Sequence, residues 1–288
     1  MGIPIINLEQ FEKKLKDNSA FILLTTIFDN NIKKYLYHIG VEEIVDVYFS
    51  EFHTYPSDIS ELNIYNSYSE FLKVFELLED YQSKEILCES LRCRLYDDVY
   101  RLFSEPCREK YFGEGIFKQD EKEVLLCLGG SNGDTLFYFL EKYENFEAAI
   151  LFEPENIEVL KSNLNILPQE IKKKIELVDY YASNFSGGKN IRIDDWIENK
   201  KISLITMDIE GMEAKALEGA KNVIIKQKPI LALSAYHKWD DLIVFTKWIS
   251  SISYEYRFYL RKYGALNSMN RNEIVLYAVP LNRRKNDE

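Results

Sequence analysis

"EVLLCLGGSNGDT", residues 123–135, runs from an apolar segment into three glycines and then an acidic residue. A short apolar run bounded by glycine is typical of a buried strand, and the apolar residues that follow Gly133 have helical spacing. The segment therefore predicts a strand, a glycine turn and a helix. In such a turn Gly129, Gly130 and Gly133 allow a ligand to approach main-chain N–H groups, because no Cβ atom is in the way.

Apolar runs of strand length recur after this segment, and helical segments lie between most of them. Near-continuous apolar runs are typical of parallel strands that are covered on both faces. Residues 257–280 read as two more strands joined by a loop at 267–272, which predicts an antiparallel hairpin. The expected fold is α/β with a mostly parallel sheet, and such sheets bind ligands at the carboxyl ends of their strands. The parallel strands are expected at 123–128, 148–153, 174–179, 203–208 and 229–236.

The beginning of the chain has a different pattern. Residues 20–50 read as a strand, a helix and a strand, and two helices are expected within 60–103. We therefore expect two domains, a smaller α/β and helical region at 1–118 and the main sheet at 119–288. The sequence leaves open whether the first region is a lid, a substrate contact or an oligomer contact, for example in a homodimer.

Composition limits the classes of partner. The 288 residues carry a formal net charge of −11, which disfavours nucleic acid and anionic membranes as partners. No run of 18 apolar residues occurs, and the first residues lack the pattern of a signal peptide, so we expect no membrane insertion and a cytoplasmic location. The four cysteines follow no CxxC pattern, which favours free thiols over a zinc site or a disulfide framework.

An acidic residue, Glu153, ends the second predicted strand, 20 residues after Gly133. In α/β nucleotide sites an acid at this place binds ribose hydroxyls. The loop spacing is G-G-x-x-G rather than G-x-G-x-x-G, and Asp134 puts negative charge where a pyrophosphate needs the helix N-terminus. Both features favour a nucleoside without phosphates, and S-adenosylmethionine is the common cofactor of that kind. The alternative is a tight turn followed by a solvated acid before Pro154.

Six segments follow one another along the chain: "EVLLCLGGSNGDT", "ILFEPENIEVLKSNL", "IRIDDWI", "SLITMDIEGMEAKALEGAKNVI", "KPILALSAYHKWDDL" and "YLRKYG...NEIVLYAVP". In order and spacing they resemble the FkbM-type methyltransferases over about residues 110–280. The resemblance implies a Rossmann-like class I fold and S-adenosylmethionine as cofactor. It also implies methylation of a hydroxyl on a sugar, a glycan or a small natural product.

The family's glycine loop, its ribose acid and the place where adenine packs after the third strand all have counterparts in this chain. Cys127 is a departure, because the family has an acid at this position. The resemblance therefore implies that a contact to the methionine end of the cofactor is missing or replaced. The expected cofactor-binding residues are Gly129, Gly130, Gly133, Asp134, Thr135, Glu153, Pro154, Tyr181, Ala182 and Asp208.

Candidate catalytic residues follow two other strands. Methyl transfer to a hydroxyl needs an in-line approach and a group that accepts the proton or stabilises the alkoxide. Asp208 and Glu210 end the fourth predicted strand, and Tyr236 and His237 end the fifth, so all four project from the carboxyl edge. We expect His237 to be the base, since an imidazole titrates near neutral pH, with Asp208 and Glu210 beside it.

The acidic residues near these strand ends have alternative interpretations. Asp208, Glu210 and Glu213 match the acids of the family's D-x-E-G-x-E signature, but helix capping is an alternative for each. Asp208 is expected to orient the substrate, to hold the cofactor amine or to bind a divalent ion, although the sequence supports no metal site. Asp194 and Asp195 read as turn and cap residues rather than metal ligands.

The sequence is compatible with three functions. The leading one is an O-methyltransferase that acts on a saccharide or a small metabolite. The second is a nucleoside-binding interaction module that has lost methyl transfer through the change at Cys127. The third is a nicotinamide-dependent oxidoreductase.

Overall fold

The chain, seen in a computed structural model, divides into two compact units, residues 1–54 and 55–288. In the first unit β1 (Ile22–Leu24) pairs in parallel with β2 (Ile44–Asp46), as expected of a strand–helix–strand unit. The helix expected between them lies outside the described residues. The structure describes residues 22–24, 44–46, 61–96, 110–113, 115–120, 122–197, 200–263 and 273–285.

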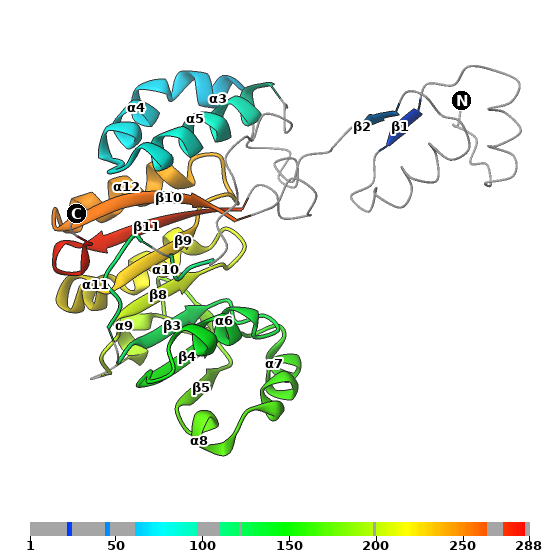
Figure 1. The fold of residues 1–288 in the computed structure, drawn as a ribbon, viewed down its shortest axis with the longest axis vertical. Coiled ribbons are helices and arrows are strands. Elements are labelled where there is room, and N and C mark those ends of the chain that lie inside the picture. Colours follow the sequence, from blue (N-terminus) through cyan, green and yellow to red (C-terminus); the bar gives the residue numbers. More distant parts are fainter. Residues whose placement is uncertain are drawn as a thin grey trace, which may run out of the picture. The chain divides into compact units, whose positions relative to one another are not determined.

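A seven-stranded sheet forms the centre of the second unit (Figure 1), and its strand order is β10-β11-β9-β8-β3-β4-β5. The five strands from β9 to β5 are parallel, and β11 is antiparallel to both of its neighbours. The mostly parallel sheet and its antiparallel hairpin are thus confirmed, and the second strand of the hairpin lies next to β9. The strands are β3 (Val124–Leu128), β4 (Ala148–Phe152), β5 (Ile175–Val178), β8 (Leu204–Met207), β9 (Ile230–Ser234), β10 (Tyr256–Lys262) and β11 (Ile274–Pro280).

Helices connect the parallel strands and cover the sheet. They are α6 (Asp134–Lys142), α7 (Ile157–Asn163), α8 (Gln169–Lys172), α9 (Ile193–Trp196), α10 (Glu213–Gly219), α11 (Lys221–Gln227) and α12 (Asp241–Ile252). Short elements complete the unit: β6 (Tyr181–Ala182), β7 (Asn190–Ile191), η3 (Leu164–Ile166) and η4 (Leu281–Arg283). Among the helices that the structure describes, none has the length and apolar character of a membrane span.

Successive strand residues point to opposite faces, so the sheet has two cores. Leu126 and Leu128 of β3 pack with side chains of α9 to α12 and of the helices before the sheet. Leu125 and Cys127 point the other way and pack with α6, α7 and an irregular segment at 111–117. This is why the strands read as continuous apolar runs in the sequence.

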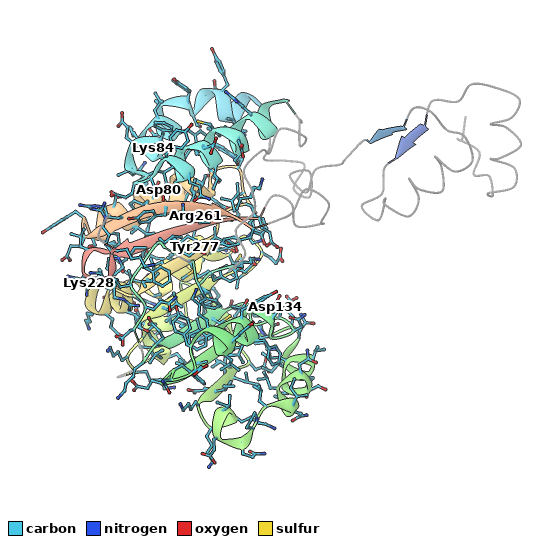
Figure 2. All side chains as sticks on the ribbon, viewed as in Figure 1. Asp80, Lys84, Asp134, Lys228, Arg261 and Tyr277 are labelled. Carbon is cyan, nitrogen blue, oxygen red and sulfur yellow. The ribbon has the colours of Figure 1, made fainter. Side chains whose placement is uncertain are left out.

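Three helices of residues 61–96 pack at the β10 edge: α3 (Glu61–Asn66), α4 (Tyr68–Leu77) and α5 (Tyr81–Tyr96). Figure 2 shows Asp80 beside Arg261 of β10, and the Arg261 guanidinium donates to the Asp80 carboxylate at 2.6 Å. These helices thus belong to the same compact unit as the sheet, which differs from the boundary expected between residues 118 and 119. Their role as a lid, substrate contact or oligomer contact stays a prediction.

The glycine turn after β3 depends on close backbone approach. Gly129 and Gly133 have φ values of 90° and 95°, in the left-handed region that favours glycine. The N–H groups of Gly129 and Gly130 both donate to the Phe152 carbonyl at the end of β4. A Cβ atom on Gly129 would lie 2.0 Å from the carbonyl oxygen of Asp208, which follows β8. The loops after β3 and β8 therefore meet at a position that only glycine permits.

We predict that Gly129→Ala destabilises the protein more than a left-handed backbone alone explains. Gly188→Ala is the matched control, because Gly188 has φ 59° and a Cβ atom added to it would meet nothing within 4 Å. The control should cost roughly 1 kcal/mol and Gly129→Ala roughly 3 kcal/mol or more in the free energy of unfolding. Denaturant unfolding measures both, and equal losses would contradict the close contact with Asp208.

Candidate functional site

The glycine loop and the acid after β4 are joined by direct contacts. Glu153 is buried, and its Oε2 accepts the N–H of Ser131 at 2.6 Å. Its Oε1 accepts the N–H groups of Glu155 and Asn156 at 2.9 and 2.8 Å, just before α7. The carboxylate therefore holds the loop after β3 against the loop after β4. The alternative of a solvated acid is thus wrong for Glu153.

The other residues expected near the cofactor lie along the same edge. Tyr181 is exposed and donates a hydrogen bond to Glu155, whereas Ala182 is buried in the core beneath. Pro154 is half-buried, and its carbonyl accepts from Lys189. Burial, then the nearby Glu155, raises the pKa of Tyr181. Tyr181 is thus an exposed aromatic ring beside the acids that follow β4.

The remaining loop residues begin α6. Asp134 is exposed, and its carboxylate accepts the N–H of Thr135, which is buried. Cys127 lies beneath the loop, and its thiol points to the Gly129 carbonyl at 3.7 Å. Burial, with smaller contributions from Asp134, Asp208 and Glu153, raises the pKa of Cys127 to about 12. At neutral pH the side chain is therefore an uncharged thiol and does not replace a carboxylate.

Asp208 lies directly after β8 and is the centre of a polar network. Its Oδ2 accepts from the Tyr111 hydroxyl at 2.6 Å and from Lys110 Nζ at 3.3 Å. Its Oδ1 accepts from the Tyr236 hydroxyl at 3.1 Å and lies 3.4 Å from His237 Nε2. A carboxylate has about four lone-pair directions, so these four donors occupy it fully.

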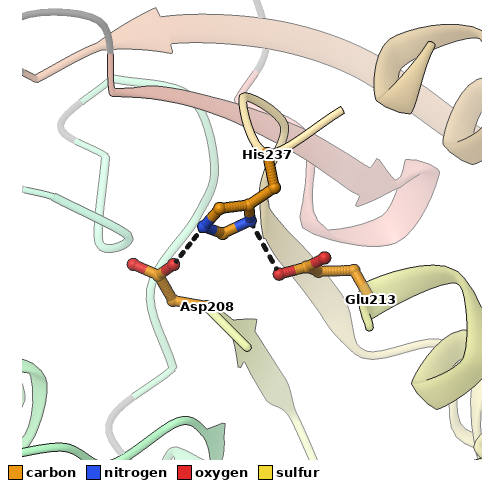
Figure 3. Close-up of side chains that lie close together, drawn as sticks. All are labelled: Asp208, Glu213 and His237. Atoms are coloured by element: carbon orange, nitrogen blue, oxygen red, sulfur yellow. Dashed lines mark ion pairs between the residues drawn. The ribbon is translucent and has the colours of Figure 1, made fainter. Parts of the chain in front are cut away.

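His237 lies between two carboxylates, as Figure 3 shows. Its Nδ1 is 3.0 Å from Glu213 Oε1, and its Nε2 faces both Asp208 and Glu210, the latter at 3.6 Å. Glu213 is fully buried, and its Oε1 also accepts the N–H of Ile209. Glu210, by contrast, has a side chain that is 85% exposed. The ring therefore connects a buried carboxylate to an exposed one.

The surrounding acids change the charge state of His237. Burial alone lowers its pKa, but Glu213, then Asp208 and Glu210, more than offset this effect and raise the pKa to about 9. The expected titration near neutral pH is thus wrong, because three carboxylates favour the imidazolium. At pH 7 both ring nitrogens carry a proton.

The same three side chains are close enough to hold a cation, because one ligand atom from each of Asp208, Glu213 and His237 lies within 4.8 Å of the others. The two carboxylates, however, face opposite nitrogens of the ring (Figure 3). Acidic oxygens therefore lie on both sides of the imidazole, which favours its protonated form.

The structure brings together Asp208, Glu210, Tyr236 and His237, as the strand pattern predicted. Four further residues of the network were missed: Lys110, Tyr111, Ser234 and Glu273. Lys110 Nζ pairs with Glu273 Oε2 at 2.8 Å, and the Tyr111 hydroxyl lies 3.1 Å from Ser234 Oγ. Ser234 ends β9 two residues before Tyr236, and this position at a strand end was the available signal; the other three residues had none.

Glu213 and Asp194 have different roles: the first contacts the candidate site and the second caps a helix. Glu213 is the first residue of α10, but its carboxylate turns back to Ile209 and His237 and so fixes the site loop. Asp194 accepts the N–H groups of Asn222 and Val223. It therefore caps α11, whereas the expected cap role was for the short helix at its own place in the sequence, α9, in which Asp194 is the second residue.

The glycine loop and the Asp208 network meet where the strand order reverses. The chain runs from β3 outward through β4 to β5 and then returns to β8 on the other side of β3. The loops after β3 and β8 diverge from this point, which is where open α/β sheets bind their ligands. Asp208 donates its N–H to Leu128, so the glycine loop and the Asp208 network are adjacent.

We predict that His237 makes folding stability depend on pH above neutrality. A pKa raised from 6.5 to about 9 gives a stabilisation that is complete below pH 6.5 and is lost as pH rises through about 9. Its size is on the order of 3 kcal/mol. The Tm advantage of the wild type over His237→Gln should therefore shrink between pH 7 and 10.

Glu213→Gln is the companion variant, because it removes the first cause of the raised pKa and leaves the ring in place. Its loss of stability should also be largest at neutral pH and fade above pH 9. A Tm difference that stays constant with pH for both variants would mean that His237 is neutral in the folded protein.

Comparisons with known proteins show similarity to methyltransferases. The family model described as the methyltransferase FkbM domain matches residues 188–265. A crystal structure of methyltransferase FkbM from Methylobacillus flagellatus KT matches with a TM-score of 0.79 and 25% sequence identity, over 96% of this chain and 78% of that chain. A putative rRNA methylase from Clostridium thermocellum matches with a TM-score of 0.40 and 12% identity, over 59% of this chain and 91% of that chain. None of the curated proteins matches the chain.

The matched residues contain the loops after β8 and β9, and therefore Asp208 and His237. The class I methyltransferase fold expected from the sequence is confirmed by the strand order and by the structure with the TM-score of 0.79. The resemblance on which that expectation rested is confirmed as well.

Proposed function

We propose that this FkbM-type methyltransferase uses S-adenosylmethionine to methylate a hydroxyl of a sugar or another small metabolite. The observation that carries the proposal is the meeting of the Gly129 loop with the Asp208 network at the point where the strand order reverses. A nucleoside cofactor and a polar acceptor then have adjacent sites on one edge of the sheet.

The residues of this edge fit such a cofactor in most respects. Gly129 and Gly133 leave the turn without side chains, and Glu153 places a buried carboxylate beside it. Cys127 fits less well, since a neutral thiol does not attract an ammonium group. Asp134 is exposed and acts electrostatically on Cys127, so it is the acid placed to take over the amine of the cofactor.

When bound, the cofactor supplies an electrophilic methyl group on a sulfonium. Glu153 would hold the ribose hydroxyls, Tyr181 would cover the adenine, and the main chain of the glycine loop would border the methionine part. A neutral or cationic ligand suits this edge, because Asp134 is exposed in the first turn of α6 and weakens the attraction of the helix N-terminus for an anion.

The acceptor hydroxyl would bind beside Tyr236, His237 and Glu210. In this arrangement Asp208 has no lone pair free, because four donors already occupy its oxygens. His237 becomes a base only after it loses the Nε2 proton. The exposed carboxylate of Glu210 lies 3.6 Å from Nε2 and is placed to pass that proton to solvent. The side chains thus orient the hydroxyl and remove its proton, while the surrounding acids set the pH at which this happens.

A calorimetric titration with S-adenosylmethionine and S-adenosylhomocysteine tests the cofactor site. We predict micromolar binding to the wild type and an affinity at least about tenfold lower for Glu153→Gln, since a hydrogen bond to a charged group is lost. Glu158→Gln is the control, because Glu158 is exposed and pairs only with Lys161 among the described residues. If the folded wild type binds neither compound, the methyltransferase proposal fails and an interaction module is the better reading.

A pH–rate profile tests the role of His237. If its neutral form accepts the proton, kcat for methyl transfer should rise with pH and level off above about 9. His237→Gln should lower kcat by roughly 100-fold or more, remove this rise and leave the Kd of the cofactor nearly unchanged. A wild-type rate that is flat from pH 7 to 10 would instead assign His237 to orienting the acceptor as an imidazolium.

A further inference from the structure

A segment that precedes the sheet in the chain reaches into the site. Residues 110–113 lie before β3, and their first two side chains contact Asp208. The Tyr111 hydroxyl donates to Asp208 Oδ2 at 2.6 Å and also lies 3.1 Å from Ser234 Oγ. Lys110 Nζ lies between Asp208 and Glu273, at 3.3 and 2.8 Å. Lys110 and Tyr111 thus link the Asp208 carboxylate to Ser234 and to Glu273, which lie in two other parts of the chain.

The backbone of Tyr111 is strained. Its φ of 68° is in the left-handed region, which costs a bulky residue roughly 1–2 kcal/mol. Phe112 holds the segment in place, because its ring packs against Phe139 and Tyr143 at centroid distances of 5.6 and 6.0 Å. Strained residues of this kind persist where the surroundings fix them, and they cluster at functional sites.

Packing alone does not require the contacts of this segment with Asp208. Tyr143 belongs to the same core and has a buried hydroxyl with no hydrogen-bond partner among the described residues. A buried phenol is therefore tolerated there without a hydrogen bond to an acid. Moreover, Lys110, Glu273 and Asp208 are largely removed from water, and burying charges in this way is a poor source of stability.

We propose that Tyr111 is a positioning residue for methyl transfer, which acts through Asp208, and that Lys110 assists it. The catalytic consequence rests on the function proposed above. Tyr111 and Lys110 occupy Oδ2, so Oδ1 stays directed toward Tyr236 and His237 Nε2. The orientation of the ring that faces the acceptor then depends on a residue outside the span of the family match.

The phenol is suited to this task because it keeps its proton. Burial first, and then the negative charge of Asp208, hold the pKa of Tyr111 well above 10. The hydroxyl is therefore a hydrogen-bond donor to Asp208 over the whole pH range in which His237 titrates.

The test compares Tyr111→Phe with Tyr143→Phe, which deletes a hydroxyl from the same core without touching Asp208. The first readout is the pH titration of the His237 ring by NMR in the protein without ligands, where the chain has only three histidines to distinguish. Tyr111→Phe should move the midpoint by about half a pH unit or more from its value near 9, and Tyr143→Phe should leave it in place. The second readout is kcat, which should fall by roughly 10- to 100-fold in Tyr111→Phe alone, with little change in cofactor Kd.

If folded Tyr111→Phe shows the same His237 titration as the wild type, the proposal is overturned. The Tyr111 hydroxyl would then only join residues 110–113 to the sheet. An equal loss of kcat in both variants would overturn it too. If Tyr111→Phe does not fold, Lys110→Met removes the other Oδ2 contact and should shift the titration as well. If Tyr111→Phe shifts the His237 titration but the wild type shows no methyl transfer, the positioning of Asp208 by Tyr111 is retained and the proposed reaction is refuted.

Discussion

The candidate site depends on one close contact between two segments of the backbone. Gly129 can lie against the Asp208 carbonyl only because it has no Cβ atom, and this contact joins the loops after β3 and β8. Glu153 holds the other side of the glycine loop through the N–H of Ser131. This edge of the sheet is thus built from backbone groups held by the Glu153 carboxylate and by the contact with the Asp208 main chain, and the side chains of the candidate site are placed by the ends of the strands that carry them.

A second constraint is the balance of charge around Asp208. Glu213, Asp208 and Glu210 surround His237, while Lys110 lies between Asp208 and Glu273. The acids keep the imidazole protonated at neutral pH, and the protonated ring in turn offsets part of their repulsion. The charge state of the ring therefore depends on the acids that the fold brings to it, which ties the folding of this edge to its chemistry.

The sequence predicts the part of this arrangement that is local. Strand runs and their carboxyl ends place Asp208, Tyr236 and His237 on one edge, since parallel strands end on the same side. It does not predict the proton affinity of His237, because Glu213 reaches the ring only after a turn in which Glu210 and Gly211 both have positive φ. Lys110 and Tyr111 lie almost 100 residues from Asp208 in the chain, and neither spacing nor residue type indicated that pairing. Long-range contacts between single side chains leave no periodic trace in a sequence.

The position of β11 has a consequence for how the protein is made. Among the described strands, β10 joins the sheet through β11 alone, and α5 packs on β10. Helices α3 to α5 therefore have no complete surface to dock on until β11 has been inserted beside β9. Assembly of this side of the molecule thus waits for β11, and contacts between such distant parts of a chain form slowly. Glu273 directly precedes β11, so Lys110 gains this partner at the same step, and the network around Asp208 is complete only when the whole sheet is.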